Sequence, residues 1–279
     1  MKTHTVLKYL LLGTLATLIA TFYLPGKEEE ASAYPPRDFA QIRQDSLIRI
    51  ATEYHSIGFH VDSDSLALSG FHYELMKEFA QHYRLKIELS TAMNFEEQLK
   101  GLSEGKYDLL ANSIHMTSEL KDSLLLTHPL LISREVLVQR KPRSKEDSTR
   151  FIRQQLDLAG KTIHLSKGSP TIYRLRNLGS EIADTIYIKE VEKYGPEQLI
   201  AMVAHGDIEY TVCDASTARI AADSLPQIDV QTAISFKQFY SWAVSKHAPV
   251  LLDSLNTWLD DYVKSKKYRL LYKRYFSFN

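Results

Sequence analysis

The feature that most constrains the fold is a regular alternation between short apolar runs and amphipathic segments. The first series begins at residue 47 and reads, in order, as strand LIRIAT, helix SGFHYELMKEFAQHYR, strand LKIELS, helix FEEQLKGLSEGK and strand YDLLANS. Apolar residues recur with helical spacing in the longer segments and form continuous or alternating runs in the shorter ones. This β-α-β-α-β order predicts a parallel sheet with crossover helices.

The same alternation restarts in the second half of the chain. From residue 161 it reads as strand KTIHLSKG, helix SPTIYRLRNLG, strand TIYIKEV, helix GPEQLIAMVAHGD, strand YTVCD and helix ASTARIAADS. A charged segment before it, 142–155, predicts a surface excursion, and the apolar stripe in 249–276 predicts one long closing helix. No residue pattern repeats at a fixed period, which excludes a solenoid.

Two extended runs, at about 131–140 and 236–245, connect these series and predict two crossings between two α/β lobes. Lobe I is expected to hold 46–133 plus 241–279, and lobe II is expected to hold 134–240. Open α/β sheets bind ligands at the carboxyl ends of their strands. The expected site is therefore the cleft between the lobes.

The first 33 residues differ from the rest of the chain. Lys2 and Lys8 precede the apolar stretch YLLLGTLATLIATFYLP, and ASA at 31–33 is similar to a signal-peptide cleavage site. The stretch is shorter than the ~20 residues of a usual membrane span, so a cleaved signal peptide and a retained N-terminal anchor both stay open. Either one predicts that the working part of the chain is periplasmic or otherwise extracytoplasmic.

Composition excludes several classes of partner. Lysine and arginine total 34 against 34 aspartate and glutamate, so nothing favours nucleic acid. The single cysteine, Cys213, cannot form an internal disulfide, and its apolar neighbours predict a buried structural thiol. The sequence carries no nucleophile motif, metal-ligand spacing or phosphate loop, so we expect neither catalysis nor a cofactor.

Six segments in this order resemble the extracellular solute-binding protein family 3, which has the type II periplasmic binding fold. They are LIRIATEY, SGFHYELMKEFAQHYRLKIEL, EEQLKGLSEGKYDLLANSIHMTSE, LAGKTIHLSKGSP, GDIEYTVCD and WLDDYVKSKKYRLLYKRYF. Within the family, the chain is similar to the N-terminal, non-catalytic module of membrane-bound lytic murein transglycosylase F. The transglycosylase domain that follows that module has no counterpart in the sequence up to Asn279. The resemblance implies an α/β, two-lobed fold with two hinge crossings that closes on a small ligand.

The resemblance also implies a ligand-contact loop at ANSIHMTSELKD, where the strand YDLLANS ends. In amino-acid-binding members this loop carries a hydroxyl residue, a threonine and then an arginine, which grips the ligand carboxylate with two parallel hydrogen bonds. Ser113 and Thr117 match this pattern, and His115 stands where a small hydroxyl residue is usual. Leu120 occupies the position expected for the arginine. This departure argues against a free α-amino acid as the ligand.

Further residues are expected at the cleft. In the segment SKGSPT, Gly168, Ser169 and Thr171 are expected to contact the ligand, with Ser169 capping a helix whose first N–H groups form an anion pocket. By the same resemblance, Asp214 at the end of YTVCD is expected to pair with a ligand ammonium. Tyr54 is expected to wall the cleft with its ring.

Each of these residues also has an ordinary structural interpretation. His115 fits a solvated loop histidine, Asp214 fits a helix N-cap and Tyr54 fits a packed tyrosine. If the cleft functions, Asp214 without the arginine suggests a ligand that keeps a cationic or donor group but has no exposed carboxylate. An amino-acid derivative, a peptide or a muropeptide fragment meets this description.

Three functions remain open from the sequence. The favoured one is a monomeric solute-binding protein that closes on a small polar ligand for transport or cell-wall sensing, with an ABC permease or a cell-wall enzyme as partner. The second is a regulatory or scaffold module whose cleft is degenerate. The third is a dehydratase of cyclic acids that uses Glu53, His115 and Asp214 as acid–base groups.

Overall fold

The computed structural model describes residues 37–62, 66–92, 94–117, 120, 122–145 and 147–276. The predicted signal or anchor segment, 1–33, lies outside the described residues. Within the described part of the chain, none of the helices combines the length and the apolar character that a membrane crossing requires.

The first sheet has the strand order β4-β1-β5-β13-β6, with β7 added along β13. Its strands are β1 (Leu47–Thr52), β4 (Lys86–Thr91), β5 (Leu109–Ile114), β6 (Leu124–Leu126), β7 (Leu131–Ser133) and β13 (Gln238–Ser245). Strands β4, β1 and β5 are parallel, and the connecting helices are α3 (Phe71–Tyr83) and α4 (Phe95–Ser103). The β-α-β-α-β prediction is therefore confirmed.

Helices cover both faces of this sheet. Four helices, α2 (Phe39–Asp45), α3, α9 (Pro249–Tyr262) and α10 (Lys266–Phe276), pack their apolar side chains on one face, while α4 packs on the other. Parallel strands buried on both faces need mainly apolar side chains in both directions, which explains why apolar residues predominate in β1, where Arg49 and Thr52 are the polar exceptions. Trp242 of β13 is fully buried in the larger cluster.

The second sheet has the order β10-β9-β11-β8-β12. Its strands are β8 (Glu135–Arg140), β9 (Thr162–Ser166), β10 (Tyr187–Val191), β11 (Tyr210–Asp214) and β12 (Ile228–Asp229). Helix α6 (Thr171–Glu181) packs on one face, and α7 (Pro196–His205) and α8 (Ala215–Ser224) pack on the other. The predicted second α/β series is confirmed, with β9, β10 and β11 parallel.

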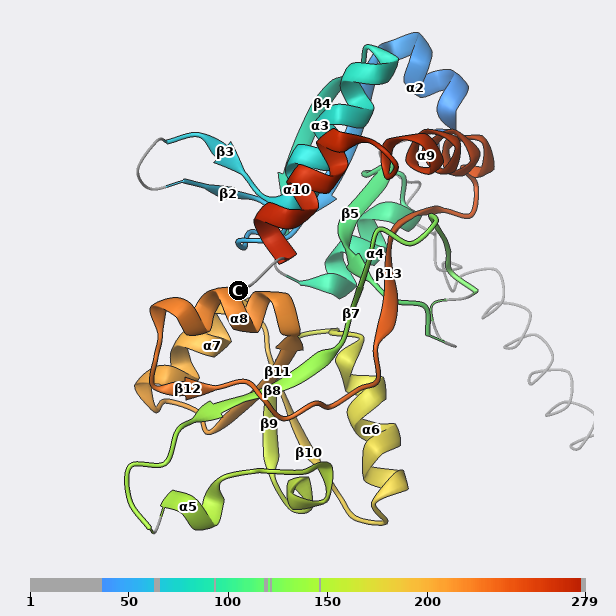
Figure 1. Ribbon diagram of the computed structural model, residues 1–279. Helices are drawn as coiled ribbons and strands as arrows, with labels where there is room; N and C mark the ends of the chain where they lie inside the picture. Colours follow the sequence, from blue (N-terminus) through green and yellow to red (C-terminus); the bar gives the residue numbers. More distant parts are fainter. Residues whose placement is uncertain are drawn as a thin grey trace, which may run out of the picture. The chain divides into compact units, whose positions relative to one another are not determined.

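Two extended segments connect the sheets, as Figure 1 shows for β7–β8 and β13. The run predicted as an extended crossing divides at Arg134 into β7 of the first sheet and β8 of the second. Strand β13 comes from the far end of the chain and pairs with β7 in antiparallel register, with Phe239 opposite Ile132. The two-lobed architecture with two hinge crossings follows from these pairings.

The prediction of one closing helix was wrong, because the segment forms two helices separated at 263–265. The Ser265 hydroxyl accepts the Tyr268 N–H at 3.0 Å and so caps the start of α10. The break lets α10 turn back onto α3, where the rings of Phe276 and Phe71 lie 4.8 Å apart. Tertiary packing outweighs the continuous helical periodicity here.

Several short elements were not predicted from the sequence. They are α2, the hairpin β2 (His60–Val61) and β3 (Leu68–Ser69), β6, β12, α5 (Asp147–Arg150) and a 3₁₀ turn at Gln155–Leu158. All of these elements except α2 have two to four residues, which is too short for a period to be recognised.

A buried ionic cluster connects the start of the described chain to the first sheet. Asp108, which is 4% exposed, accepts hydrogen bonds from the backbone N–H of Arg49 at 2.7 Å and from its guanidinium at 3.0 Å. It also accepts the Nε–H of Arg37 at 3.2 Å. The cluster ties the segment before α2 to β1 and to the residue that precedes β5.

We expect Asp108→Asn to lower the free energy of unfolding by about 3–5 kcal/mol, because it leaves two partly buried guanidinium groups without their shared carboxylate. Chemical denaturation measures the change. Asp253→Asn, at an exposed position of α9, is the matched control. Equal stability of the two variants would contradict the role assigned to Asp108.

Candidate functional site

A cavity of about 100 Å³ lies between the lobes where the central strands end. Lobe I contributes Glu53, which follows β1, and Ser113 and His115 at the end of β5. Lobe II contributes Ser166 from β9 and Asp214 from β11. The carboxyl ends of parallel strands meet here, as the sequence predicted.

The lobes also contact each other beside the cavity. Glu197, in the first turn of α7, accepts hydrogen bonds from the backbone N–H of Ser56 at 3.0 Å and from its hydroxyl at 2.5 Å. Gly168 lies so close to Glu96 that an added Cβ would be 2.8 Å from the Glu96 Cβ. Because Gly168 also has a φ of +69°, both the backbone conformation and the approach of the other lobe favour glycine.

Two carboxyl groups face the cavity from neighbouring strands of lobe II. Glu135 and Asp214 are direct partners in the antiparallel pairing of β8 and β11, so their side chains lie on the same face of the sheet. Burial raises the pKa of Glu135 from its ordinary value of 4.5 to about 7, and Asp214 contributes to the rise. Burial also raises the pKa of Asp214, against the lowering influence of Ser133 and Ser216.

Within the described residues, each of these carboxyl groups has one oxygen that accepts a hydrogen bond and one that does not. Glu135 Oε1 accepts the Thr171 hydroxyl at 2.5 Å, and Asp214 Oδ1 accepts the Ser216 N–H at 2.8 Å. Glu135 Oε2 and Asp214 Oδ2 are buried and have no hydrogen-bond partner among the described residues. Ser166 and Tyr240 also line the cavity, and their buried hydroxyl oxygens likewise have no hydrogen-bond partner among the described residues. Buried polar atoms without partners are rare in proteins, and a ligand or ordered water normally satisfies them.

Burial disfavours the charged form of the histidines beside the cavity. Burial lowers the pKa of His55 to about 4, and His55 Nδ1 accepts the N–H groups of Ile57 and Gly58 at 3.2 and 3.3 Å. Its Nε2 lies 3.5 Å from Glu53, whose pKa burial raises to about 7. Burial also lowers the pKa of His115, whose ring packs edge-on against Tyr240 with 5.6 Å between centroids.

The structure brings most of the sequence-predicted site residues together. Five of them line the cavity: Ser113, His115, Ser169, Thr171 and Asp214. Tyr54 is outside its lining, is 41% exposed and contacts Phe59 instead, and Thr117 and Gly168 are also outside. Asp214 is the N-cap of α8 as well, so its structural interpretation and its cleft position coexist. Cys213 is buried, as predicted.

At the start of α6, where an anion pocket was predicted, the N-cap residue and its surroundings differ from the prediction. Pro170, not Ser169, occupies the N-cap position, and the Ser169 hydroxyl accepts the Thr171 N–H at 3.3 Å. The Glu135 carboxyl already lies against the first residue of this helix through its bond to Thr171. A ligand carboxylate at this point would meet a protein carboxyl group.

Leu120 lies in the apolar core and is not among the residues that line the cavity. It is 5% exposed and belongs to the apolar cluster between α4 and the first sheet. Among the described residues that line the cavity there is no lysine or arginine. Arg174 lies near Glu135, but its Nε donates to the Ile234 carbonyl at 2.9 Å and its Nη1 pairs with Glu181 at 2.7 Å.

The sequence reasoning missed Glu135, Ser166 and Tyr240 as cavity residues. Glu135 carried a usable signal, because it is a carboxylate inside the apolar run LLISREVLVQ, and charged residues are rarely buried without a reason. Ser166 and Tyr240 carried none, because hydroxyl residues are common near strand ends. As to metal binding, no group of three or more histidine, cysteine, aspartate or glutamate side chains in the described part of the chain is arranged to hold an ion.

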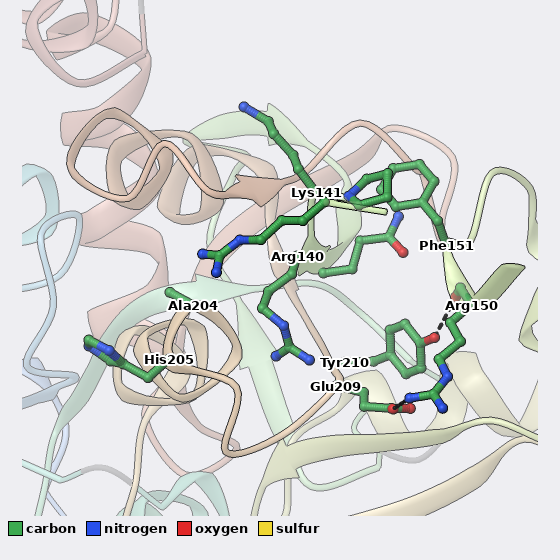
Figure 2. Close-up of a pocket in the computed structure, with 11 residues that line it drawn as sticks. Arg140, Lys141, Arg150, Phe151, Ala204, His205, Glu209 and Tyr210 are labelled. Atoms are coloured by element: carbon green, nitrogen blue, oxygen red, sulfur yellow. Dashed lines mark hydrogen bonds and ion pairs between the residues drawn. The ribbon is translucent and has the colours of Figure 1, made fainter. Parts of the chain in front are cut away.

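A second hollow, of about 280 Å³, lies on lobe II and is lined by several basic residues (Figure 2). Its cations have partners within the protein. Arg140 donates to the carbonyls of Val203 and Ile208 at 2.7 and 2.9 Å, and Arg150 pairs with Glu209 at 3.5 Å. None of the sequence-predicted site residues lines this hollow. The cavity between the lobes is therefore the candidate functional site.

Two lobes, two hinge crossings and a polar cavity at the strand ends define the chain as a protein with the type II periplasmic binding fold. Residues 48–278 match the family described as bacterial extracellular solute-binding proteins, family 3. The chain belongs to this family.

Individual relatives agree with this assignment. Membrane-bound lytic murein transglycosylase F of Pseudomonas fluorescens is 26% identical over 243 residues, which cover 86% of this chain and 48% of the relative. The chain thus spans about half the length of the curated relatives it matches. Among solved structures, a mutant of the arginine-binding protein ArgBP from T. maritima superposes with a TM-score of 0.71 at 23% identity, covering 86% of this chain and 99% of that one.

A further solved structure is an ancestral amino acid-binding protein, AncCDT-1, described as a precursor of cyclohexadienyl dehydratase. It superposes with a TM-score of 0.68 at 19% identity and covers 85% of this chain and 98% of that one. These similarities establish the fold, and the ligand has to be argued from the cavity of this chain.

We expect Leu120→Arg to destabilise the protein by more than about 3 kcal/mol without creating a carboxylate clamp, because the new guanidinium would be buried among apolar side chains. Leu120→Met, which nearly conserves volume, is expected to cost less than about 1.5 kcal/mol. Thermal unfolding compares the two. A stable Leu120→Arg variant that gains affinity for free amino acids would show that this position can reach the cleft.

We expect Glu135→Gln to change how stability depends on pH. A carboxyl group whose pKa is raised on folding favours the folded state when protonated, so wild-type stability falls as pH rises from about 4.5 to about 7. Over this pH range the free energy of unfolding of the wild type falls by on the order of 3 kcal/mol. Glu135→Gln should therefore unfold at a higher temperature than the wild type at pH 8, but not at pH 4. Glu88→Gln, on the exposed side of β4, should leave the unfolding temperature unchanged at both pH values. Parallel pH profiles of Glu135→Gln and wild type would contradict the assignment.

Proposed function

We propose that this chain is an extracytoplasmic solute-binding protein whose lobes close on a small polar ligand with a cationic group and no free carboxylate. An amino-acid amide or another amino-acid derivative fits this description, and so does the end of a peptide or muropeptide fragment. The proposed role is binding for transport or cell-wall sensing, not catalysis.

One observation carries this proposal. In the described part of the chain, the buried oxygens Glu135 Oε2 and Asp214 Oδ2 have no hydrogen-bond partner, and both belong to residues that line the same cavity on paired strands. An ammonium or guanidinium group carries only donors and a positive charge, so it would satisfy both oxygens and relieve the repulsion between two carboxylates. With no lysine or arginine among the described lining residues, a ligand carboxylate would lack a counter-charge.

The same chemistry argues against the two other functions. Cyclic carboxylic acids, the substrates considered for a dehydratase, would bring further negative charge next to Glu53, Glu135 and Asp214. A degenerate scaffold cleft would have no use for several buried polar atoms at one cavity, because only ordered water would compensate for the cost of burying them. The unpaired oxygens therefore favour a cleft that is filled by a ligand.

The family suggests where such a protein works and with what. Extracellular solute-binding proteins deliver ligands outside the cytoplasm, and an ABC permease is one proposed partner of a monomeric chain. The transglycosylase relatives suggest a cell-wall enzyme as the other partner. The segment 1–33 would supply export or anchoring.

A thermal-shift comparison of L-argininamide, L-arginine and agmatine tests the ligand class. We expect L-argininamide to raise the melting temperature by roughly 5 °C at about a hundredfold its dissociation constant, and L-arginine to have a smaller effect at equal concentration. Asp214→Asn keeps an N-cap acceptor but removes the charge, so it should lose most of the shift, whereas Asp253→Asn should keep it. Stronger stabilisation by free L-arginine would contradict the proposal. Mass spectrometry of any compound that copurifies with the chain gives an independent identification.

A further inference from the structure

A buried histidine connects the hinge strand to the ligand cavity. His72, in the first turn of α3, is fully buried and lies between Trp242 of β13 and Ser113 of β5. The indole Nε1–H of Trp242 donates to His72 Nδ1 at 3.0 Å. On the other side of the ring, His72 Nε2 lies 2.9 Å from the Ser113 hydroxyl oxygen.

The indole decides where the imidazole carries its proton. An indole N–H can only donate, so His72 Nδ1 must be an acceptor without a proton. The neutral ring then carries its proton on Nε2 and donates it to Ser113 Oγ. Burial, with a smaller contribution from His55, lowers the pKa of His72 to about 3, so this arrangement persists across the physiological pH range.

The consequence for Ser113 is a fixed hydrogen-bond polarity. Its oxygen already accepts from His72, and its own O–H has no acceptor among the described residues. Ser113 lines the cavity, so the remaining direction for this proton is towards the ligand. A serine hydroxyl has one O–H donor and two acceptor lone pairs, and here the bond from His72 uses one lone pair, so the proton must point away from the imidazole.

We propose that His72, held by Trp242, is a positioning residue that makes Ser113 a hydrogen-bond donor into the cavity. The ligand then presents an uncharged acceptor oxygen, such as an amide or peptide carbonyl, to lobe I and its cationic group to Glu135 and Asp214 in lobe II. This inference rests on the proposed function, because it divides the same cavity into a donor side and an acceptor side.

Two amide variants of His72 separate the two halves of the relay. The side-chain oxygen of Asn reaches the position of Nδ1, so His72→Asn can still accept from Trp242 but cannot donate to Ser113. The side-chain nitrogen of Gln reaches the position of Nε2, so His72→Gln can still donate to Ser113 but cannot accept from Trp242. Each variant loses one buried hydrogen bond, which makes them matched controls for stability.

Isothermal titration calorimetry on the purified full chain compares L-argininamide with agmatine, which lacks the carbonyl group. We expect the wild type to bind the amide about tenfold more tightly than agmatine. Ser113→Ala should bring this ratio to about one, His72→Asn should lower it by about threefold, and His72→Gln should keep it. Equal effects of the two His72 variants on both compounds would reduce His72 to a packing residue and overturn the proposal.

A second measurement needs no ligand. Long-range ¹H–¹⁵N correlation spectra of the free protein at pH 7 should show His72 as the neutral ring protonated at Nε2. A ring protonated at Nδ1, or a charged ring, would overturn the relay even if both compounds bind. Conversely, failure of both compounds to bind would reject the proposed function and its ligand class, and the spectra would still decide whether His72 fixes Ser113 as a donor.

Discussion

Burying a carboxyl group costs free energy unless a partner compensates, and this chain buries two of them on directly paired residues of neighbouring strands. Glu135 and Asp214 each form a hydrogen bond through one oxygen, and the other oxygen has no partner among the residues that the structure describes. The rest of the site is consistent with this constraint. The cavity is rich in acceptors on the lobe II side, and the described lining contains no protein cation that would neutralise them.

The hinge strand β13 links this constraint to the architecture. It pairs with β5, β6 and β7, and it supplies Tyr240 to the cavity and Trp242 to the buried histidine. One strand therefore contributes to the first sheet, to a hinge crossing and to the wall of the site. A displacement of the lobes that bends β13 would also move the groups around the ligand, which is how two-lobed proteins couple ligand binding to closure.

The departure from amino-acid-binding members of the family is consistent on both sides of the cleft. On lobe I, Leu120 packs into the core where an arginine would be expected to hold a carboxylate. On lobe II, Glu135 lies against the start of α6, where a ligand anion would otherwise be favoured. Neither position offers a counter-charge to a ligand carboxylate, while Asp214 lines the cavity. Both observations support the proposed ligand, which has a cationic group and no free carboxylate.

The sequence alone determined the two α/β series, the extended crossings and the cleft at the strand ends, and it named five of the residues that line the cavity there. The hydrophobic period, and the order in which helices and strands follow each other along the chain, can be recognised from local sequence. Parallel strands of one sheet then bring their carboxyl ends to the same edge. Ser113 and Asp214 lie at the ends of strands in different sheets, and the structure places both in the lining of one cavity.

Only the tertiary structure decided the polarity of the site. Glu135 faces Asp214 because of the register of an antiparallel pair, and no local pattern specifies that register. His72 and Trp242, 170 positions apart, meet through the packing of α3 on β13. The break at 263–265 likewise depends on where α10 finds its partner helix. Register and packing are long-range properties, so the identity of the partners, and with it the chemistry of the cleft, appears only in the folded chain.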